Sequence, residues 1–278
     1  MVIPCGDNLE TLSRCLLSVM NQEVKAAQIV VVYNSATPMP ESLKNYLKSL
    51  NVVILEFPSL IGPSKARNLG ILSSKEEYVA FLDADDEWAP NKLSLQLNFM
   101  KKNSLSFTTT DFQIVDVLNS RNWIVCNKDY TKEDIQRRCH IGLGSTSMIK
   151  LSDIAPNQYF DESLSRFEDW DFMLRLYRTN KKIGNLKNAL TVVHRTPNEN
   201  RNRASQALNI LESKHSSQGY LDRHLASGLW LERAVIQFRE KRIHFLWYLL
   251  KSLVLDPRQI VFYNKHILRR LSTRTTKQ

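Results

Sequence analysis

The chain has 278 residues, of which 43% are hydrophobic and 24% are charged, and these values are typical of globular proteins and exclude a disordered chain. The length suits one α/β domain with an appendage, or two small domains. No apolar run approaches the ~18 residues of a membrane-spanning helix, and no basic leader precedes the first expected strand. We therefore expect a cytoplasmic protein that does not span a membrane.

The net charge of +10 is unevenly distributed along the chain. Residues 1–200 contain 23 Lys and Arg against 23 Asp and Glu, whereas residues 201–278 contain 15 against 5. A neutral body with a basic tail indicates an anionic partner such as a membrane surface or a nucleic acid. The four cysteines lack the spacing of a zinc site or a redox pair, which favours reduced structural thiols.

The first part of the chain alternates short apolar runs with helical patterns. The runs lie at residues 1–4, 29–33, 52–57 and 78–83, and a spacing of roughly 25 residues is that of successive right-handed βαβ units. Asp7 or Asn8 is expected to cap the first helix, and Pro63 to open the third. This order predicts an α/β fold with a doubly wound, mostly parallel central sheet that binds its ligands at the carboxyl ends of the strands.

The second part has weaker signals. An amphipathic helix is expected at 90–102, strands at 106–112, 114–118 and 123–126, and a short helix that Thr131 caps with Asp134 three residues on. The small residues at 142–147 precede an apolar strand, and their glycines lack the pattern of a phosphate-binding loop. Beyond residue 200, helical spacings cover 204–223, 225–239, 243–255 and 259–271.

The fourth apolar run ends in the sequence V-A-F-L-D-A-D-D-E-W, from Val79 to Trp88. Asp83, Asp85 and Asp86 would then meet at a ligand-binding edge, and their mutual repulsion would be relieved by a hard divalent cation, Mg²⁺ or Mn²⁺. The alternative is a solvated acidic turn that leads into the next helix. A second acidic cluster, F-E-D-W-D, begins at Phe167 where a helical pattern starts.

Three blocks in this order carry a resemblance: I-G-P-S-K-A-R-N-L-G-I at 61–71, F-L-D-A-D-D-E-W-A-P-N-K-L at 81–93 and F-E-D-W-D-F-M-L-R-L at 167–176. From about Val2 to about His194 the chain resembles the family 2 glycosyltransferases, which have the Rossmann-like glycosyltransferase A fold, invert the sugar and use a metal-binding D-x-D. The resemblance implies a catalytic domain at 1–200, with a nucleotide-sugar half at 1–105 and an acceptor half at 106–200. A basic helical region would follow at 201–278.

The resemblance and the residue chemistry together suggest roles for individual side chains. Asp169 is expected to be the catalytic base and Glu168 to orient it or hold the acceptor, with Asp171 as an alternative base. Where the family shows D-D-G-S, this chain has Tyr33-Asn34-Ser35-Ala36, so either Tyr33 and Asn34 contact the base by different chemistry or the segment is only a turn. The expected donor-binding residues are Pro4, Asn34, Arg67, Asn68 and Asp83. The expected metal ligands are Asp85, Asp86 and His194. For His194, a purely structural role is the alternative.

The function that follows is inverting transfer of a sugar from a nucleotide-diphosphate donor to a hydroxyl of a glycan or lipid-linked glycan, in cell-surface polysaccharide or lipopolysaccharide synthesis. The alternatives are a sugar-phosphate nucleotidyltransferase and a nucleic-acid-binding protein. The first predicts a basic glycine-rich loop after the first strand, which Cys5-Gly6-Asp7-Asn8 does not provide; the second predicts a recognition signature that the tail lacks. The tail either packs as a helical subdomain or docks on the cytoplasmic face of an anionic inner membrane.

Overall fold

The computed structural model describes residues 1–7, 9–116, 120–126, 131–138, 144–194, 201–240 and 242–260. The chain forms two compact units. Unit 1 contains Met1–Tyr130 and Ile141–Glu199, and unit 2 contains Thr131–His140 and Asn200–Gln278. The division near residue 200 is close to the sequence-based one, but residues 131–140, which the sequence pattern had placed in the acceptor half, belong to unit 2.

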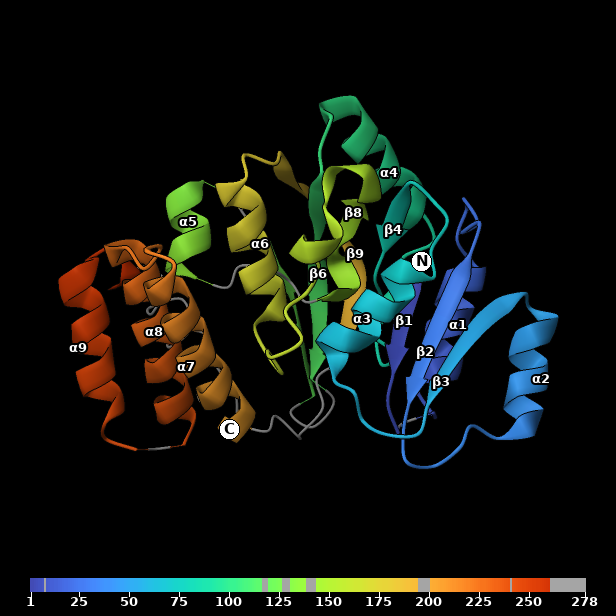
Figure 1. The fold of residues 1–278 in the computed structure, drawn as a ribbon, viewed down its shortest axis with the longest axis horizontal. Helices are drawn as coiled ribbons and strands as arrows, with labels where there is room; N and C mark the ends of the chain where they lie inside the picture. The colour runs from blue at the N-terminus through green and yellow to red at the C-terminus, as the bar shows by residue number, and fades with distance from the viewer. Residues whose placement is uncertain are drawn as a thin grey trace. The chain divides into compact units, whose positions relative to one another are not determined.

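The first sheet of unit 1 is parallel, in the order β1-β2-β3 (Figure 1). Every residue of β2 is buried, because helices cover both faces of a parallel sheet of this kind. The strands alternate with helices as the apolar runs predicted. Their bounds are β1 (Val2–Cys5), α1 (Leu12–Met20), β2 (Ile29–Asn34), α2 (Glu41–Ser49), β3 (Val52–Phe57) and α3 (Pro63–Leu72). Pro63 opens α3 as expected, whereas Thr11, not Asp7, occupies the N-cap position of α1, and Asn8 lies outside the described residues.

The second sheet of unit 1 is mixed, in the order β4-β8-β6-β9-β5, with β7 paired to β6. Its strands are β4 (Tyr78–Ala80), β5 (Glu87–Trp88), β6 (Phe107–Asp116), β7 (Arg121–Val125), β8 (Met148–Lys150) and β9 (Ile183–His194), and its α-helices are α4 (Lys92–Asn103) and α6 (Glu168–Arg178). The strand β6 is continuous where the sequence pattern indicated two strands, because Gln113, at the expected break, pairs with Ile124 of β7 and Val192 of β9. The register shifts of β6 lie before this point, between Thr110 and Phe112. A bridge between Val2 and Phe81 joins the two sheets beside the acidic segment.

Unit 2 is helical and consists of α5 (Lys132–Arg137), α7 (Arg201–Ser217), α8 (Arg223–Arg239) and α9 (Phe245–Leu255). Thr131 caps α5 by accepting a hydrogen bond from the Asp134 N–H, as predicted. The expected helix at 259–271 lies largely outside the described residues. Among the helices of the described ranges, none is both long enough and apolar enough to cross a membrane.

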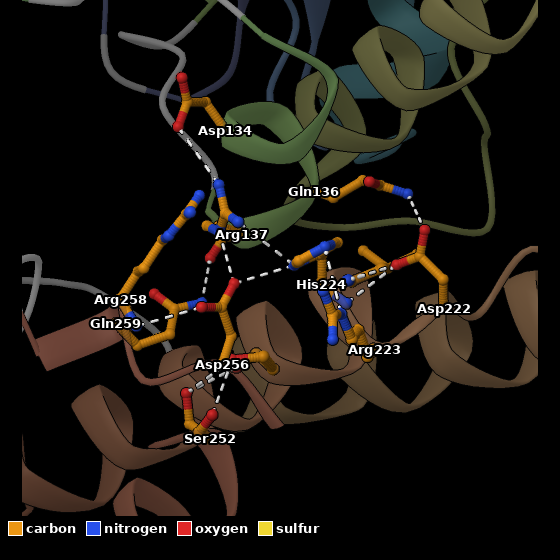
Figure 2. A network of polar contacts seen from close by, with 12 residues as sticks. Asp134, Gln136, Arg137, Asp222, Arg223, His224, Ser252, Asp256, Arg258 and Gln259 are labelled. Atoms are coloured by element: carbon orange, nitrogen blue, oxygen red, sulfur yellow. Dashed lines mark hydrogen bonds and ion pairs between the residues drawn. The ribbon is translucent and has the colours of Figure 1, made fainter. Parts of the chain in front are cut away.

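A buried polar network joins α5 to the C-terminal helices, from which it is far removed in sequence (Figure 2). Arg137 Nε lies 2.5 Å from Asp256 Oδ2, and His224 Nδ1 lies 2.8 Å from the same oxygen. These contacts lower the pKa of Asp256, since Arg137 and His224 outweigh the opposing effect of burial. The Gln136 side chain donates to Asp222, which also caps α8. This network explains why residues 131–140 belong to unit 2.

The helix α3 lies directly against β1 because Gly70 has no side chain. A Cβ added at Gly70 would lie 2.2 Å from Cγ1 of Val2, a fully buried residue of β1. The close approach fixes the position of α3, and with it Arg67, relative to the strand ends.

We expect Gly70→Ala to lower the free energy of unfolding by roughly 1–3 kcal/mol, because overpacking a rigid contact outweighs the gain in helix propensity. Urea denaturation measures the change. The loss in the double variant Gly70→Ala/Val2→Ala should be smaller than the sum of the two single losses, since Val2→Ala removes Cγ1 and Cγ2, the atoms that clash most closely. Equal stability of Gly70→Ala and the native chain would contradict the proposed packing.

Candidate active site

The two acidic segments that the sequence singled out meet at one buried guanidinium group. Arg67 of α3 places Nη2 2.7 Å from Asp83 Oδ1 and Nη1 2.5 Å from Glu168 Oε1. Asp83 follows β4, and Glu168 is the first residue of α6. Arg67 is only 3% exposed, so these contacts are shielded from solvent. The structure thus brings together Arg67, Asp83 and Glu168, three residues predicted to belong to the site.

The charges of this cluster keep Arg67 protonated despite its burial. Burial alone would lower the pKa of Arg67, but the charges of Asp83 and Glu168 outweigh it and hold the pKa above its usual value. A buried charge of this kind is tolerated only when it is paired with good geometry, and a planar guanidinium can serve two carboxylates at once. Arg67 is therefore a fixed cation at the centre of the site.

Gly144 leaves room for that guanidinium. A Cβ at Gly144 would lie 2.4 Å from Nη2 of Arg67, so no other residue fits without displacing it. Within this small-residue segment, the close approach that the structure describes is that of Gly144 to Arg67. Gly142 and Leu143 lie outside the described residues.

Asp86 is held by hydrogen bonds on both carboxylate oxygens. Its Oδ2 accepts from the Ser145 hydroxyl at 2.5 Å, and its Oδ1 accepts from the His194 backbone N–H at 3.1 Å. It is 2% exposed, and burial, followed by the charges of Asp83 and Asp85, raises its pKa well above the ordinary value. Both oxygens already stabilise the loop, which favours a supporting role for Asp86, and its expected role as a metal ligand stays a prediction.

Ser145 is a site residue that the sequence analysis did not identify. Besides donating to Asp86, its hydroxyl oxygen accepts from the Asp83 N–H at 3.0 Å, and its carbonyl accepts from the Trp88 indole at 2.7 Å. The one available signal was its place in a run of small polar residues before a strand. Ser145 thereby fixes the conformation of the whole acidic segment.

Arg14 and Glu87 support the same segment from its other side, and neither was identified from the sequence. Arg14 Nη2 donates to the Asp85 carbonyl at 2.7 Å, while its Nε lies 3.1 Å from Glu87 Oε1. The same Glu87 oxygen lies 2.6 Å from Nε2 of His194. His194 is therefore oriented by Glu87, which leaves Nδ1 as the ring nitrogen for any ligand.

Asp85 differs from Asp86: the contact described for it is made by its backbone carbonyl, whereas the side chain of Asp86 is held by two hydrogen bonds. Asp85 is partly buried, and its pKa is raised by burial first and by the charge of Asp83 second. A cation placed beside it would relieve both effects. Among the described residues, no three His, Cys, Asp or Glu side chains are grouped closely enough to enclose a metal ion by themselves.

Asp169 lies in the first turn of α6, next to Glu168. Burial first, and then the charge of Glu168, raise its pKa to about 7 even though Arg67 opposes the shift. The preceding residue, Phe167, has a φ of +62°, a conformation that bulky side chains adopt rarely and that marks strained functional segments. Asp171, the alternative base, is fully buried and paired with Arg175 at 2.7 Å, so its carboxylate is not presented to a substrate.

The predicted base-reading segment lies at the ends of β1 and β2. The Asn34 amide donates to the Cys5 carbonyl at 2.9 Å, and Pro4 is the register partner of Val32. Tyr33 is 1% exposed and its hydroxyl donates to the Thr37 carbonyl, so its ring is not available for stacking on a base. Asn34 remains the residue through which this edge could contact a nucleotide.

Asn68 has a structural role instead of an open side chain. Its amide donates to the Phe160 carbonyl at 2.8 Å and to Glu162 Oε1 at 3.0 Å, and its oxygen accepts from the Phe160 N–H at 3.0 Å. These hydrogen bonds hold the segment before α6, and the donor contact expected for Asn68 stays a prediction.

We expect Arg67→Met to reduce the free energy of unfolding by about 3–5 kcal/mol, because it leaves the buried Glu168 and the partly buried Asp83 without their cation. Chemical denaturation followed by circular dichroism measures this loss. Lys65→Met is the matched control: Lys65 is exposed on the same helix, and its replacement should change stability by no more than about 0.5 kcal/mol. Similar losses in the two variants would refute the central role of Arg67.

Comparisons with known proteins agree with this geometry. Residues 1–153, more than half of the chain, match the family model described as glycosyl transferase family 2. An uncharacterized glycosyltransferase of Rickettsia bellii is 34% identical over 116 residues, covering 42% of this chain and 17% of the relative. The Escherichia coli WfaP, a UDP-Glc:alpha-D-GlcNAc-diphosphoundecaprenol beta-1,3-glucosyltransferase, is 28% identical over 114 residues, covering 41% of this chain and 45% of the relative. The chain therefore spans less than half the length of these relatives.

Solved structures share the fold. S. aureus TarS in complex with UDP-GlcNAc has a TM-score of 0.66 at 17% identity, covering 91% of this chain and 78% of that one. The mannosyltransferase PcManGT from Pyrobaculum calidifontis, in complex with GDP-Man and Mn²⁺, has a TM-score of 0.60 at 14% identity, covering 94% and 74%. The expected α/β fold of the glycosyltransferase A type is thereby confirmed. From the family match, the chain belongs to glycosyl transferase family 2.

Proposed function

We propose that the protein transfers a sugar, with inversion, from a nucleotide-diphosphate donor to a hydroxyl group of a glycan acceptor. The observation that carries the proposal is the pair of contacts from Arg67 to Asp83 and Glu168, at 2.7 and 2.5 Å. In this proposal the first acidic segment binds the donor and the second removes the proton from the acceptor. Inverting transfer therefore requires the two segments to lie at one site. Membership of family 2 supports the same reaction.

The donor half of the proposed site is the edge formed by the strand ends and α3. Asn34 would contact the base through its carbonyl oxygen, since its amide group is held by the Cys5 carbonyl. Pro4 and Asp83 would border the nucleotide, and the N-terminus of α3 offers backbone N–H groups to an anionic phosphate. The donors named for TarS and PcManGT carry uridine and guanosine respectively, which is consistent with variable chemistry at the base.

Mg²⁺ or Mn²⁺ is the proposed cofactor. The donor set fits, because these ions commonly use one or two carboxylates and complete their shell with water and substrate phosphates. Asp85 would be the main ligand, Nδ1 of His194 is a second candidate, and Asp86 would support the loop without ligating. When bound, the ion would supply positive charge that neutralises the departing diphosphate.

Asp169 is the proposed general base. It would take the proton from the acceptor hydroxyl while that oxygen attacks the anomeric carbon from the face opposite the diphosphate, and the bond to the diphosphate breaks. A pKa of about 7 suits a base that must be deprotonated yet still attract a proton near neutral pH. Glu168, tied to Arg67, would hold Asp169 in position.

The acceptor class is proposed from the relatives. The name of WfaP specifies a sugar linked through diphosphate to undecaprenol, a membrane lipid. A lipid-linked glycan of this class, used in cell-envelope polysaccharide synthesis, would require the enzyme to work at the cytoplasmic face of the inner membrane. An anionic membrane surface is then a proposed partner, and no nucleic acid is needed.

We expect Asp85→Ala to abolish metal-dependent release of nucleoside diphosphate from a panel of nucleotide sugars, because the leaving group loses its counterion. Binding of Mn²⁺ to the protein with nucleoside diphosphate, measured by electron paramagnetic resonance, should weaken in parallel. Glu76→Ala removes one exposed acid elsewhere in unit 1 and is the control. Full activity in EDTA, or in Asp85→Ala, would rule out the metal.

Slow donor hydrolysis, in which water replaces the acceptor hydroxyl, should rise with pH and reach half its maximum near the pKa of Asp169, about 7. The sign follows from the role: the pKa lies above the ordinary value for an aspartate, and only the deprotonated form accepts a proton. Asp169→Asn should lower the rate by ~10²–10⁴-fold and remove this pH dependence while donor affinity stays intact. If the variant keeps the same pH profile, the base is another residue.

A further inference from the structure

Unit 2 has an apolar surface that its described helices, α5, α7, α8 and α9, leave uncovered. The inner face of α9 is occupied: Phe245 packs edge-on against Phe238 at 5.1 Å, and Tyr248 stacks on Trp230 at 5.7 Å. Ser252 is fully buried against Ser227 of α8, with reciprocal hydrogen bonds of 2.8 Å. This face accounts for the packing of α9 onto α8.

The outer face of the same helical segment is also apolar, and it is exposed. We call it the α9 stripe: Ile243, Leu246, Trp247, Leu250 and Val254, which are 76%, 53%, 50%, 61% and 74% exposed. Their spacing places Leu246, Trp247, Leu250 and Val254 on one side of α9, and Ile243 lies in the turn before the helix. Trp247 lies at the edge of the stripe, where its ring also packs edge-on against Trp230 with the centroids 5.6 Å apart. A contiguous exposed apolar surface of this kind marks an interaction site, whereas single exposed leucines need no explanation.

Basic side chains surround the α9 stripe. Lys251 Nζ lies 3.7 Å from the ring centroid of Trp247 and 4.5 Å from that of Trp230, so its ammonium borders the aromatic cluster. The Arg242 side chain is 64% exposed near one end of the stripe, and Arg258 is exposed beyond the other. Aromatic rings together with lysine and arginine at the edge of an apolar face are typical of helices that lie in the membrane interface.

We propose that the α9 stripe docks unit 2 on an anionic lipid bilayer, with α9 lying in the plane of the interface. The helix has 11 residues, too few to span a hydrocarbon core that needs about 20. Charge complementarity selects the partner, because residues 201–278 carry 15 basic and 5 acidic residues. A second copy would present the same excess of positive charge and is disfavoured by repulsion.

The docking rests on the proposed function in one respect: a lipid-linked acceptor gives the enzyme a reason to be at a membrane. The surface itself is independent of the reaction. Nucleoside diphosphate release measured without vesicles therefore tests the transferase, and vesicle binding measured without donor tests the docking. Each measurement can fail while the other succeeds.

Co-sedimentation of the full chain with vesicles tests the proposal. We expect binding to vesicles of phosphatidylcholine mixed with phosphatidylglycerol, little binding to phosphatidylcholine alone, and loss of binding in high salt. Leu246→Gln/Leu250→Gln should weaken binding at least about tenfold, because both side chains would be withdrawn from the bilayer. Leu17→Gln/Leu72→Gln is the matched control, since those leucines are 62% and 67% exposed in unit 1. Circular dichroism verifies that all variants are folded.

Three results would overturn the proposal. The first is a full chain that stays in the supernatant with anionic vesicles at low salt. The second is equal binding by Leu246→Gln/Leu250→Gln and the native chain, which would assign the affinity to the basic residues alone. The third is concentration-dependent self-association that this variant loses while vesicles bind neither protein, which would make the α9 stripe an interface between copies.

Discussion

The buried charge of Arg67 is the constraint on which the catalytic unit depends. A guanidinium that is 3% exposed is stable only if carboxylates meet it, and here they come from two segments, Asp83 after β4 and Glu168 at the start of α6. The two ion pairs therefore fix three elements relative to one another. The requirement extends to Gly144, which must lack a side chain for the guanidinium to fit. The contacts that stabilise the fold are thus the same ones that hold Asp83 and Glu168 in place at the candidate site.

In the acidic segment after β4, Asp86 stabilises the loop, and Asp85 is the proposed metal ligand. Asp86 accepts hydrogen bonds from the Ser145 hydroxyl and the His194 N–H. These bonds fix the loop and hold Asp85 at the edge where a cation and a diphosphate would meet. Arg14 supports the same turn through the Asp85 carbonyl. Like charges so close together would otherwise drive the segment apart. Hydrogen bonds from neighbours such as Ser145 and Arg14 thus help the three acids to remain adjacent.

Unit 2, like unit 1, is held together by a buried arginine that pairs with a carboxylate remote in sequence. A buried cation, Arg137, again joins segments remote in sequence, this time α5 and the turn after α9 through Asp256 (Figure 2). The aromatic packing of α8 against α9 then leaves the α9 stripe outside the core. Exposing several large apolar side chains to water costs free energy, and the proposed contact with a bilayer would remove that cost. The two units thus differ in what they expose: unit 1 has the acidic segment of the candidate site, and unit 2 has the α9 stripe.

The sequence by itself determined the features that depend on local pattern. The buried strands of the first sheet, the helix that Pro63 opens, the capping of α5 by Thr131 and the two acidic segments follow from apolar periodicity and residue type. The excess of apolar residues at 243–255 was also evident, but spacing alone did not say which would be covered. Only the tertiary structure decided that Asn68 is a clamp, that Asp86 is anchored and that Arg14, Glu87 and Ser145 support the site. The reason is separation along the chain: Arg67 contacts residues 16 and 101 positions away, and a pairing of that kind is set by how the strands and helices pack, which local pattern does not encode.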